Sequence, residues 1–92
     1  MKTTSAVVTV LGADRTGIVA AIAQALAGCD ANIDDIRQNV LDGIFSMTML
    51  VSFDEEQTAF NTVQEALASA GEQLGVQVRM QREDVFKFMY NV

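Results

Sequence analysis

The sequence predicts an α+β fold in which a four-stranded antiparallel sheet carries two helices on one face. The hydrophobic pattern changes between a period of two, typical of strands, and a period of three to four, typical of helices, in the order β-α-β-β-α-β. Gly, Asp and Asn occur where the period changes and mark turns. No linker or low-complexity segment interrupts the 92 residues, of which 50% are hydrophobic. We therefore expect a single domain over residues 1–92 with one modest core.

The first predicted strand covers residues 4–11, TSAVVTVL, which are rich in β-branched side chains. Strand alternation divides its apolar residues between two faces. One face is expected to carry Ala6, Val8 and Val10. The other is expected to carry Val7, Thr9 and Leu11. Both faces of this strand are therefore predicted to be at least partly covered.

The first predicted helix covers residues 16–29. Its apolar side chains recur at offsets of four, seven, eight and eleven residues, which is typical of an amphipathic helix. They are Ile18, Ile22, Ala25, Leu26 and Cys29. Gly28 and the segment CDAN are expected to end the helix. Cys29 on this apolar side is predicted to be a small buried side chain rather than a redox sensor.

A β-hairpin is predicted next. Residues 32–41 form a polar, weaker strand candidate, the pair Asp42-Gly43 is a turn signal, and residues 44–53 alternate strictly. One face of the second strand carries Phe45, Met47, Met49, Val51 and Phe53. The other carries Ile44, Ser46, Thr48, Leu50 and Ser52. We expect Met47, Met49 and Met80 to fill the core rather than to bind a metal.

The last third of the chain predicts a helix, a strand and a tail. The helix covers residues 55–70 and places four apolar side chains on one stripe: Phe60, Val63, Leu67 and Ala70. The acidic run at residues 54–56 is interpreted as a first-turn pattern that favours the helix dipole. Residues 76–81 alternate as a strand with Val76, Val78 and Met80 inward. Residues 83–92 are expected to form a short helical tail.

This order of elements is that of the ferredoxin-like fold, and right-handed crossovers leave the strand order 4-1-3-2. Two helices cover only one face of such a sheet, yet the first and third strands carry apolar residues on both faces. An exposed apolar patch usually marks an interface, so we expect a homodimer or a higher homo-oligomer. The alternative is that the tail, with Phe86, Phe88, Met89 and Tyr90, folds back over the open face of its own subunit.

Composition excludes several functions. The formal net charge of −6 opposes attraction to nucleic acid, and no apolar run is long enough to span a membrane. The chain has no His and a single Cys, so His-based catalysis and Cys or His metal sites are excluded. We expect neither an enzyme nor a cofactor. The N-terminus has no signal-peptide pattern, which predicts a cytoplasmic protein.

The segment between the first strand and the first helix is rich in small and polar residues: Gly12, Ala13, Asp14, Arg15, Thr16 and Gly17. Glycines there let the backbone approach a ligand closely, and the unpaired N–H groups of a helix start favour a carboxylate. Ile18 and Val19 stand where a phosphate-binding P-loop requires Lys and Ser or Thr, so a nucleotide site is excluded. The alternative is that Thr16 or Asp14 only caps the helix and the glycines only shape the turn.

The segment GADRTGIVAAIAQALAGCDANIDDIRQ, residues 12–38, closely resembles the first half of ACT domains, whose pattern runs G-x-D-R-x-G-I-V, a helix, then N-I and a strand. The FSM of the next strand also fits, and the whole chain resembles a stand-alone ACT-domain protein of bacteria or archaea. The resemblance implies a regulatory module that dimerises and binds an amino acid or a similar small ligand at a subunit interface.

The resemblance implies a ligand site on the positions that match the motif. They are Gly12, Ala13, Asp14, Arg15, Thr16, Gly17, Ile18, Val19, Asn32 and Ile33. Many amino-acid-binding members have Asn where this chain has Asp14, so a carboxylate is expected to hold the α-amino group here, or the ligand preference differs. Arg15 pairs with a carboxylate of the protein or reaches a ligand carboxylate. Asp34 and Asp35 could bind a cation with Asp14, although solvated carboxylates are the commoner case.

Two functions therefore follow from the sequence. The first is a ligand-sensing regulatory module whose ligand binds at the interface between two copies. The second is a protein-interaction module that docks on an enzyme or a transcription regulator without a small ligand.

Overall fold

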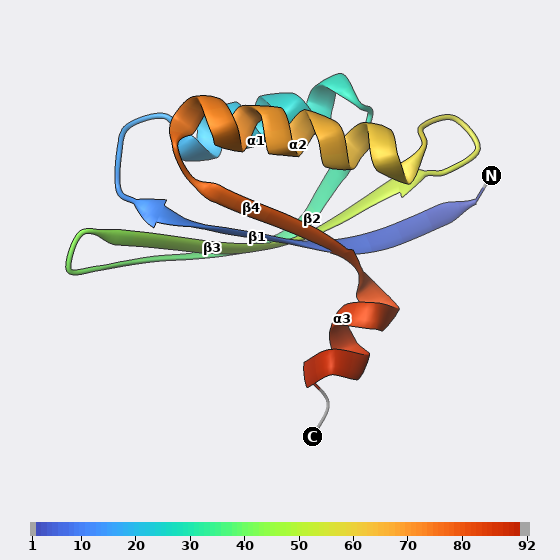
Figure 1. The fold of residues 1–92 in the computed structure, drawn as a ribbon. Helices are drawn as coiled ribbons and strands as arrows, with labels where there is room; N and C mark the ends of the chain where they lie inside the picture. The colour runs from blue at the N-terminus through green and yellow to red at the C-terminus, as the bar shows by residue number, and fades with distance from the viewer. Residues whose placement is uncertain (1, 91–92) are drawn as a thin grey trace.

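The computed structural model describes residues 2–90, and the side chains of Met89 and Tyr90 lie outside the described part. The secondary structure follows the predicted order and ends in a third helix (Figure 1). Its elements are β1 (Thr3–Ala13), α1 (Ile18–Gly28), β2 (Asn32–Leu41), β3 (Ile44–Asp54), α2 (Phe60–Leu74), β4 (Gln77–Arg82) and α3 (Glu83–Tyr90). None of the helices within residues 2–90 is long and apolar enough to cross a membrane.

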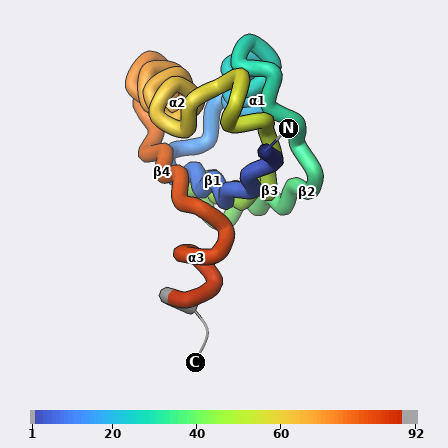
Figure 2. The backbone as a smooth tube through the Cα atoms, turned by 90° about the vertical axis from the view of Figure 1, so that its right-hand side faces the viewer, coloured from blue at the N-terminus to red at the C-terminus, as the bar shows by residue number. Residues whose placement is uncertain are grey.

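The four strands form one antiparallel sheet in the order β2-β3-β1-β4, which confirms the predicted topology. Helices α1 and α2 lie side by side on one face of the sheet, and α3 leaves it on the opposite side (Figures 1 and 2). The central pair β1 and β3 is in register along its whole length, from Thr3 opposite Asp54 to Ala13 opposite Ile44. The two edge strands are therefore β2 and β4.

The core lies between the sheet and the two helices, and strand alternation predicted its faces correctly. Every second residue of β1 and β3 is buried there: Ala6, Val8, Val10, Phe45, Met47, Met49, Val51 and Phe53. The helices contribute Ile18, Ile22, Leu26, Val63 and Leu67, and the β4 end contributes Val76 and Met80. Cys29 is partly buried against this core.

The prediction for the start of α2 was wrong. The helix begins at Phe60 rather than at residue 55, so the acidic run at residues 54–56 lies before it and not in its first turn. Asp54 ends β3, where its carboxylate accepts hydrogen bonds from the N–H groups of Lys2 and Glu56, each at 3.0 Å. These local bonds satisfy the turn and compete with helix formation, which explains the later start.

The predicted hairpin turn is confirmed at Asp42 and Gly43, which have φ angles of 53° and 79°. Positive φ at both central positions is the geometry of the type I′ turn that joins twisted antiparallel strands. Strand β2 is mostly exposed on both faces and has an irregular register between Ile33 and Asp35. Its polar sequence and its edge position explain this exposure together.

The open face of the sheet, opposite α1 and α2, is covered only in part. Helix α3 contacts β1 and β4, and Val7 is 8% exposed near it. Leu11 and Ile44 at the other end of the face are 49% and 54% exposed. Of the tail side chains that one alternative placed over this face, Phe86 lines a hollow beside Val7, Phe88 is 84% exposed, and those of Met89 and Tyr90 lie outside the described residues. Helix α3 therefore covers one end of the open face and leaves the other end open.

Candidate functional site

The β1–α1 loop, residues 14–17, is held beside the hairpin turn. Strand β1 pairs with β3 as far as Ala13, and the next N–H, that of Asp14, donates to the carbonyl of Gly43 at 2.9 Å. All four loop residues are exposed. The loop is thus fixed at its first residue while its side chains remain accessible to a ligand.

Helix α1 begins without a side-chain cap. Its N-cap is Gly17, with a φ of 90° that favours glycine, and neither Asp14 nor Thr16 caps the helix. The first helical hydrogen bond runs from the Ala21 N–H to the Gly17 carbonyl at 3.0 Å. Within residues 2–90, no side chain of the N-cap caps the first turn that contains Ile18 and Val19. Such a helix start favours a bound anion.

Gly12 is required for packing, independently of the ligand role predicted for it. A Cβ at this position would lie 2.7 Å from Cγ1 of Val76, a residue of the core. Real Cβ atoms do not approach other heavy atoms that closely. The glycine is required because Val76, just before β4, lies against β1 at this point.

Arg15 reaches away from the loop. Its Nη1 donates to the carbonyl of Leu74, the last residue of α2, at 3.1 Å. A cation at the C-terminal end of a helix interacts favourably with the helix dipole. Arg15 thus ties the β1–α1 loop to the end of α2.

Asn32 and Ile33 lie at the other end of the sheet from the loop. Asn32 pairs with Ser52 on β3, whereas Ala13 pairs with Ile44, eight positions away along the same strand. At a rise of about 3.3 Å per residue this is a separation of about 26 Å. A single chain therefore does not bring Asn32 to the β1–α1 loop.

The acidic residues considered for a cation are dispersed. Asp34 accepts a hydrogen bond from Nδ2 of Asn32 at 2.6 Å, and Asp35 forms an ion pair with Arg37 at 3.3 Å. Within residues 2–90, no three Asp, Glu, Cys or His side chains gather closely enough to hold a metal ion. Asp14 is exposed in the β1–α1 loop, before the start of α1, whereas Asp34 and Asp35 lie in β2.

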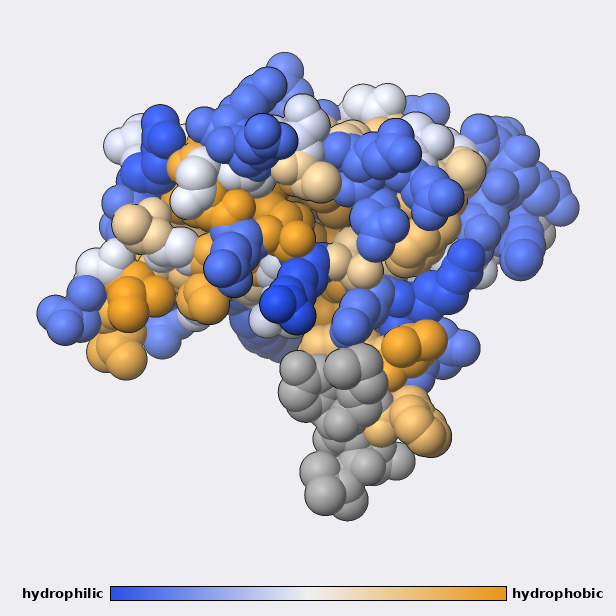
Figure 3. All heavy atoms as spheres, in the orientation of Figure 1, coloured by the Kyte–Doolittle hydropathy of each residue, from blue (hydrophilic) through white to orange (hydrophobic). Residues whose placement is uncertain are grey.

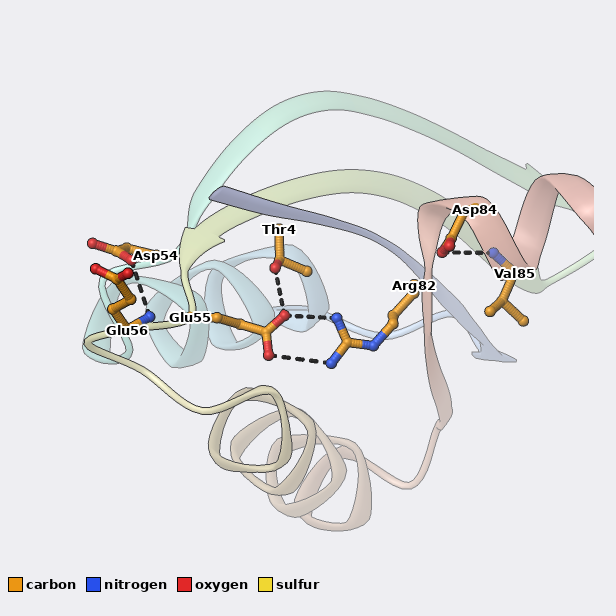
Figure 4. A network of polar contacts seen from close by, with 7 residues as sticks. All are labelled: Thr4, Asp54, Glu55, Glu56, Arg82, Asp84 and Val85. Atoms are coloured by element: carbon orange, nitrogen blue, oxygen red, sulfur yellow. Dashed lines mark hydrogen bonds and ion pairs between the residues drawn. The ribbon is translucent and has the colours of Figure 1, made fainter. Parts of the chain in front are cut away.

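The sequence interpretation missed a polar network at the other end of the molecule (Figure 4). Glu55 accepts two hydrogen bonds from Arg82, at 2.6 and 3.2 Å, and a third from the Thr4 hydroxyl. The Arg82 guanidinium also lies 4.6 Å from the centre of the Phe60 ring. Hydrogen bonds from Arg82 and then Thr4 lower the pKa of Glu55 from 4.5 to about 2. No local sequence signal could reveal this network, because its members lie far apart in the chain.

Exposed apolar side chains gather at two places on the surface (Figure 3). The first is the hairpin end, where Val40, Leu41 and Ile44 are 51%, 72% and 54% exposed. The second is α3, where Val85 and Phe88 are 46% and 84% exposed. The hairpin cluster adjoins the β1–α1 loop through the Asp14 to Gly43 hydrogen bond.

Comparison with known proteins gives a family match over most of the chain. The family model described as ACT domain matches residues 4–81. A UPF0237 protein of Methanocaldococcus jannaschii is 50% identical over 86 residues, which cover 94% of this chain and 96% of the relative. A UPF0237 protein of Methanopyrus kandleri is 52% identical over 89 residues, with 97% and 99% coverage.

Solved structures of similar fold extend this result. The ACT domain protein from Streptococcus pneumoniae is 34% identical, with a TM-score of 0.77 over 91% of this chain and 94% of that chain. A putative glycine cleavage system transcriptional repressor is 28% identical, with a TM-score of 0.78 over 87% of this chain and 46% of that chain. A formyltetrahydrofolate deformylase from Pseudomonas syringae, 22% identical at a TM-score of 0.70, shares the fold over 28% of its own length.

Proposed function

Because the chain belongs to the ACT domain family, whose members are regulatory ligand-binding modules, we propose that it binds an amino acid between two copies of itself. The observation that carries the proposal is the uncapped start of α1, which follows an exposed loop that is hydrogen-bonded to the turn of the β2–β3 hairpin. The absence of His from the sequence supports a role without catalysis. The proposed compartment is the cytoplasm.

A two-fold symmetric dimer would bring Asn32 of one copy to the β1–α1 loop of the other, which a single chain does not do. Strand β2 is an edge strand, and two such edges pair naturally in antiparallel fashion about a two-fold axis. This pairing places the start of one β2 beside the end of the other. The end of β2 leads to Gly43, which is bonded to Asp14. Asn32 of the second copy is therefore expected beside the β1–α1 loop of the first.

The residues at this interface match the groups of an amino acid. The first-turn N–H groups of α1 would donate hydrogen bonds to the ligand carboxylate, since anions are stabilised at helix starts. The exposed carboxylate of Asp14 and the amide of Asn32 are available to the α-amino group. Ile36 and Val40, 37% and 51% exposed on β2, would pack across the same edge. The ligand would thus join the two copies and stabilise the dimer by mass action.

Thermal-shift measurements with each of the twenty amino acids at millimolar concentration test this proposal. One of them is expected to raise the melting temperature, because a ligand that binds only the folded state stabilises it. The variant Asn32→Ala should keep the melting temperature of the unliganded protein and lose most of the ligand-induced shift, since Asn32 is exposed and bonds only Asp34 within the described residues.

The matched control is Asn61→Ala, the same change at an exposed position of α2 away from β2. It should leave both the melting temperature and the ligand shift unchanged. A ligand shift that survives in Asn32→Ala while the unliganded protein is strongly destabilised would make Asn32 a turn residue and remove it from the site.

A second function is a protein-interaction module that docks on an enzyme or a transcription regulator. The likeness to a putative transcriptional repressor and the exposed apolar hairpin end favour it. The absence of any thermal shift with all twenty amino acids would favour this function over the first.

A further inference from the structure

We propose that the open face of the sheet and α3 form a second contact between copies of this chain, in which each copy inserts Phe88 into a groove of the other. The groove includes Asp35 and Arg37 of β2 but lies on the open face of the sheet, whereas the proposed function uses the hydrogen-bonding edge of β2. Changes on β3 and α3 therefore test this contact without altering β2. Together the two contacts would build an assembly larger than a dimer. The occupant of the groove is thus a second copy of the same chain.

The groove lies between α3 and the open face. It has a volume of about 310 Å³, and its wall combines apolar side chains, among them Val7, Leu50 and Phe86, with polar and charged ones. A second hollow of about 390 Å³ continues along the face past Leu11 and Thr48. The two hollows give the open face the depth that an aromatic anchor needs.

Phe88 is the natural anchor for this groove. Its side chain is 84% exposed on α3, although a Phe buries on the order of 150–250 Å² when it packs. Lys87 and Phe86 on the same helix line the groove. One short helix therefore carries both a projecting aromatic ring and a wall of the cavity that could accept one. A two-fold axis close to α3 would bury the Phe88 ring of each copy in the groove of the other, because both copies use the same surface in an isologous interface.

The charges around the groove permit a second copy to approach. The chain has a net charge of −6, so most of its surface repels another copy. At the groove the charges cancel: Asp35 pairs with Arg37 at 3.3 Å, and Glu83 pairs with Lys87 at 3.8 Å. A locally neutral apolar patch on an acidic chain is where self-association meets the least repulsion.

Sedimentation velocity of the full chain tests the contact over micromolar concentrations. The wild type is expected to form species larger than a dimer, and Phe88→Asp should raise the dissociation constant of that step at least about tenfold, as the loss of an interface anchor does. Thr48→Arg, which changes an exposed side chain of the groove wall, should have the same effect. The control is Ser69→Asp on the exposed side of α2, which adds the same negative charge as Phe88→Asp. It should leave the dissociation constant unchanged.

Circular dichroism and the melting temperature establish that each variant is folded. Folded Phe88→Asp and Thr48→Arg variants with wild-type association would overturn the proposal. The ligand-induced thermal shift of these variants should stay at the wild-type level. Failure of this contact is thereby distinguished from failure of the β2-edge site.

Disulfide trapping identifies which chain supplies the ring. The double change Leu50→Cys, Phe88→Cys in a Cys29→Ser background should oxidise to a covalent dimer on a non-reducing gel, and neither single change should do so. An intramolecular disulfide would show that the tail folds on its own sheet. Either that outcome or the absence of any disulfide would contradict insertion into a second copy.

Discussion

At the residue scale, two glycines that flank the same loop are required for different reasons. Gly12 has no room for a Cβ because Val76 lies 2.7 Å from where it would be. Gly17 has open space around it but a φ of 90°, which L side chains rarely adopt. The first is a packing requirement and the second a conformational one, so they respond differently to substitution.

Gly17→Ala should lower the free energy of unfolding by about 1–2 kcal/mol, the usual cost of a left-handed conformation for a residue with a Cβ. Urea denaturation measures this. Gly28→Ala is the matched control, because Gly28 is helical, has no atom within 4 Å of the added Cβ and does not have a positive φ. It should be neutral or stabilise by up to about 1 kcal/mol. A Gly17→Ala protein as stable as the control would show that the N-cap adopts another conformation in solution.

At the scale of elements, one acidic side chain links segments that the chain keeps far apart. Glu55 follows β3, Thr4 lies in β1, Arg82 ends β4, and Phe60 begins α2. Arg82 directly precedes α3, so the same ion pair fixes the point from which α3 leaves the sheet (Figure 4). Glu55, which was expected in the first turn of α2, thus connects β1, β3 and β4, and its partner Arg82 contacts the start of α2.

Glu55→Gln should reduce stability at neutral pH, with a difference from the wild type that shrinks in acid. The folded pKa of about 2 lies below the ordinary value of 4.5, so the contribution of the carboxylate is complete above pH 4.5. It is lost as the pH falls toward 2, because the unfolded chain then takes up a proton that the folded chain does not. Urea unfolding of both proteins between pH 2 and 7 measures the difference.

Glu65→Gln is the matched control, at an exposed position of α2. It should change the free energy of unfolding little at pH 7, as surface substitutions usually do. A Glu55→Gln penalty that is the same at pH 2 and pH 7 would mean that the ion pair with Arg82 does not contribute in solution.

At the scale of the whole molecule, the fold leaves two surfaces unpaired. Strand β2 has a free edge with exposed apolar residues, and the open face is covered by α3 at one end only. The free edge exists because the sheet is open, and the uncovered face exists because α1 and α2 both lie on the other side. They favour association because exposed edges and apolar patches are available to a second chain.

Light scattering at micromolar concentration should therefore show at least a dimer. Raising the salt concentration should not dissociate it, because the proposed contacts rest on backbone hydrogen bonds and apolar side chains, whereas salt weakens chiefly interactions between exposed charges. A monomer at all accessible concentrations would remove both the β2-edge ligand site and the Phe88 contact.

The sequence by itself determined the elements, their order and the faces that they bury, because these depend on local periodicity. Alternation assigned the inward residues of β1 and β3, the Asp42-Gly43 turn defined the hairpin, and the motif around Asp14 and Gly17 identified the family. Each of these signals lies within a few neighbouring residues. The topology then followed from the handedness of the crossovers.

Only the tertiary structure decided which distant residues meet. It separated Asn32 from the β1–α1 loop, placed Val76 over Gly12, turned Arg15 toward Leu74 and paired Glu55 with Arg82. The physical reason is that such contacts depend on how strands are registered and how loops cross, and no periodicity within the chain encodes the partner of a single polar side chain. The ACT domain motif can therefore be recognised in the sequence, while the way in which its residues come together depends on the folded sheet.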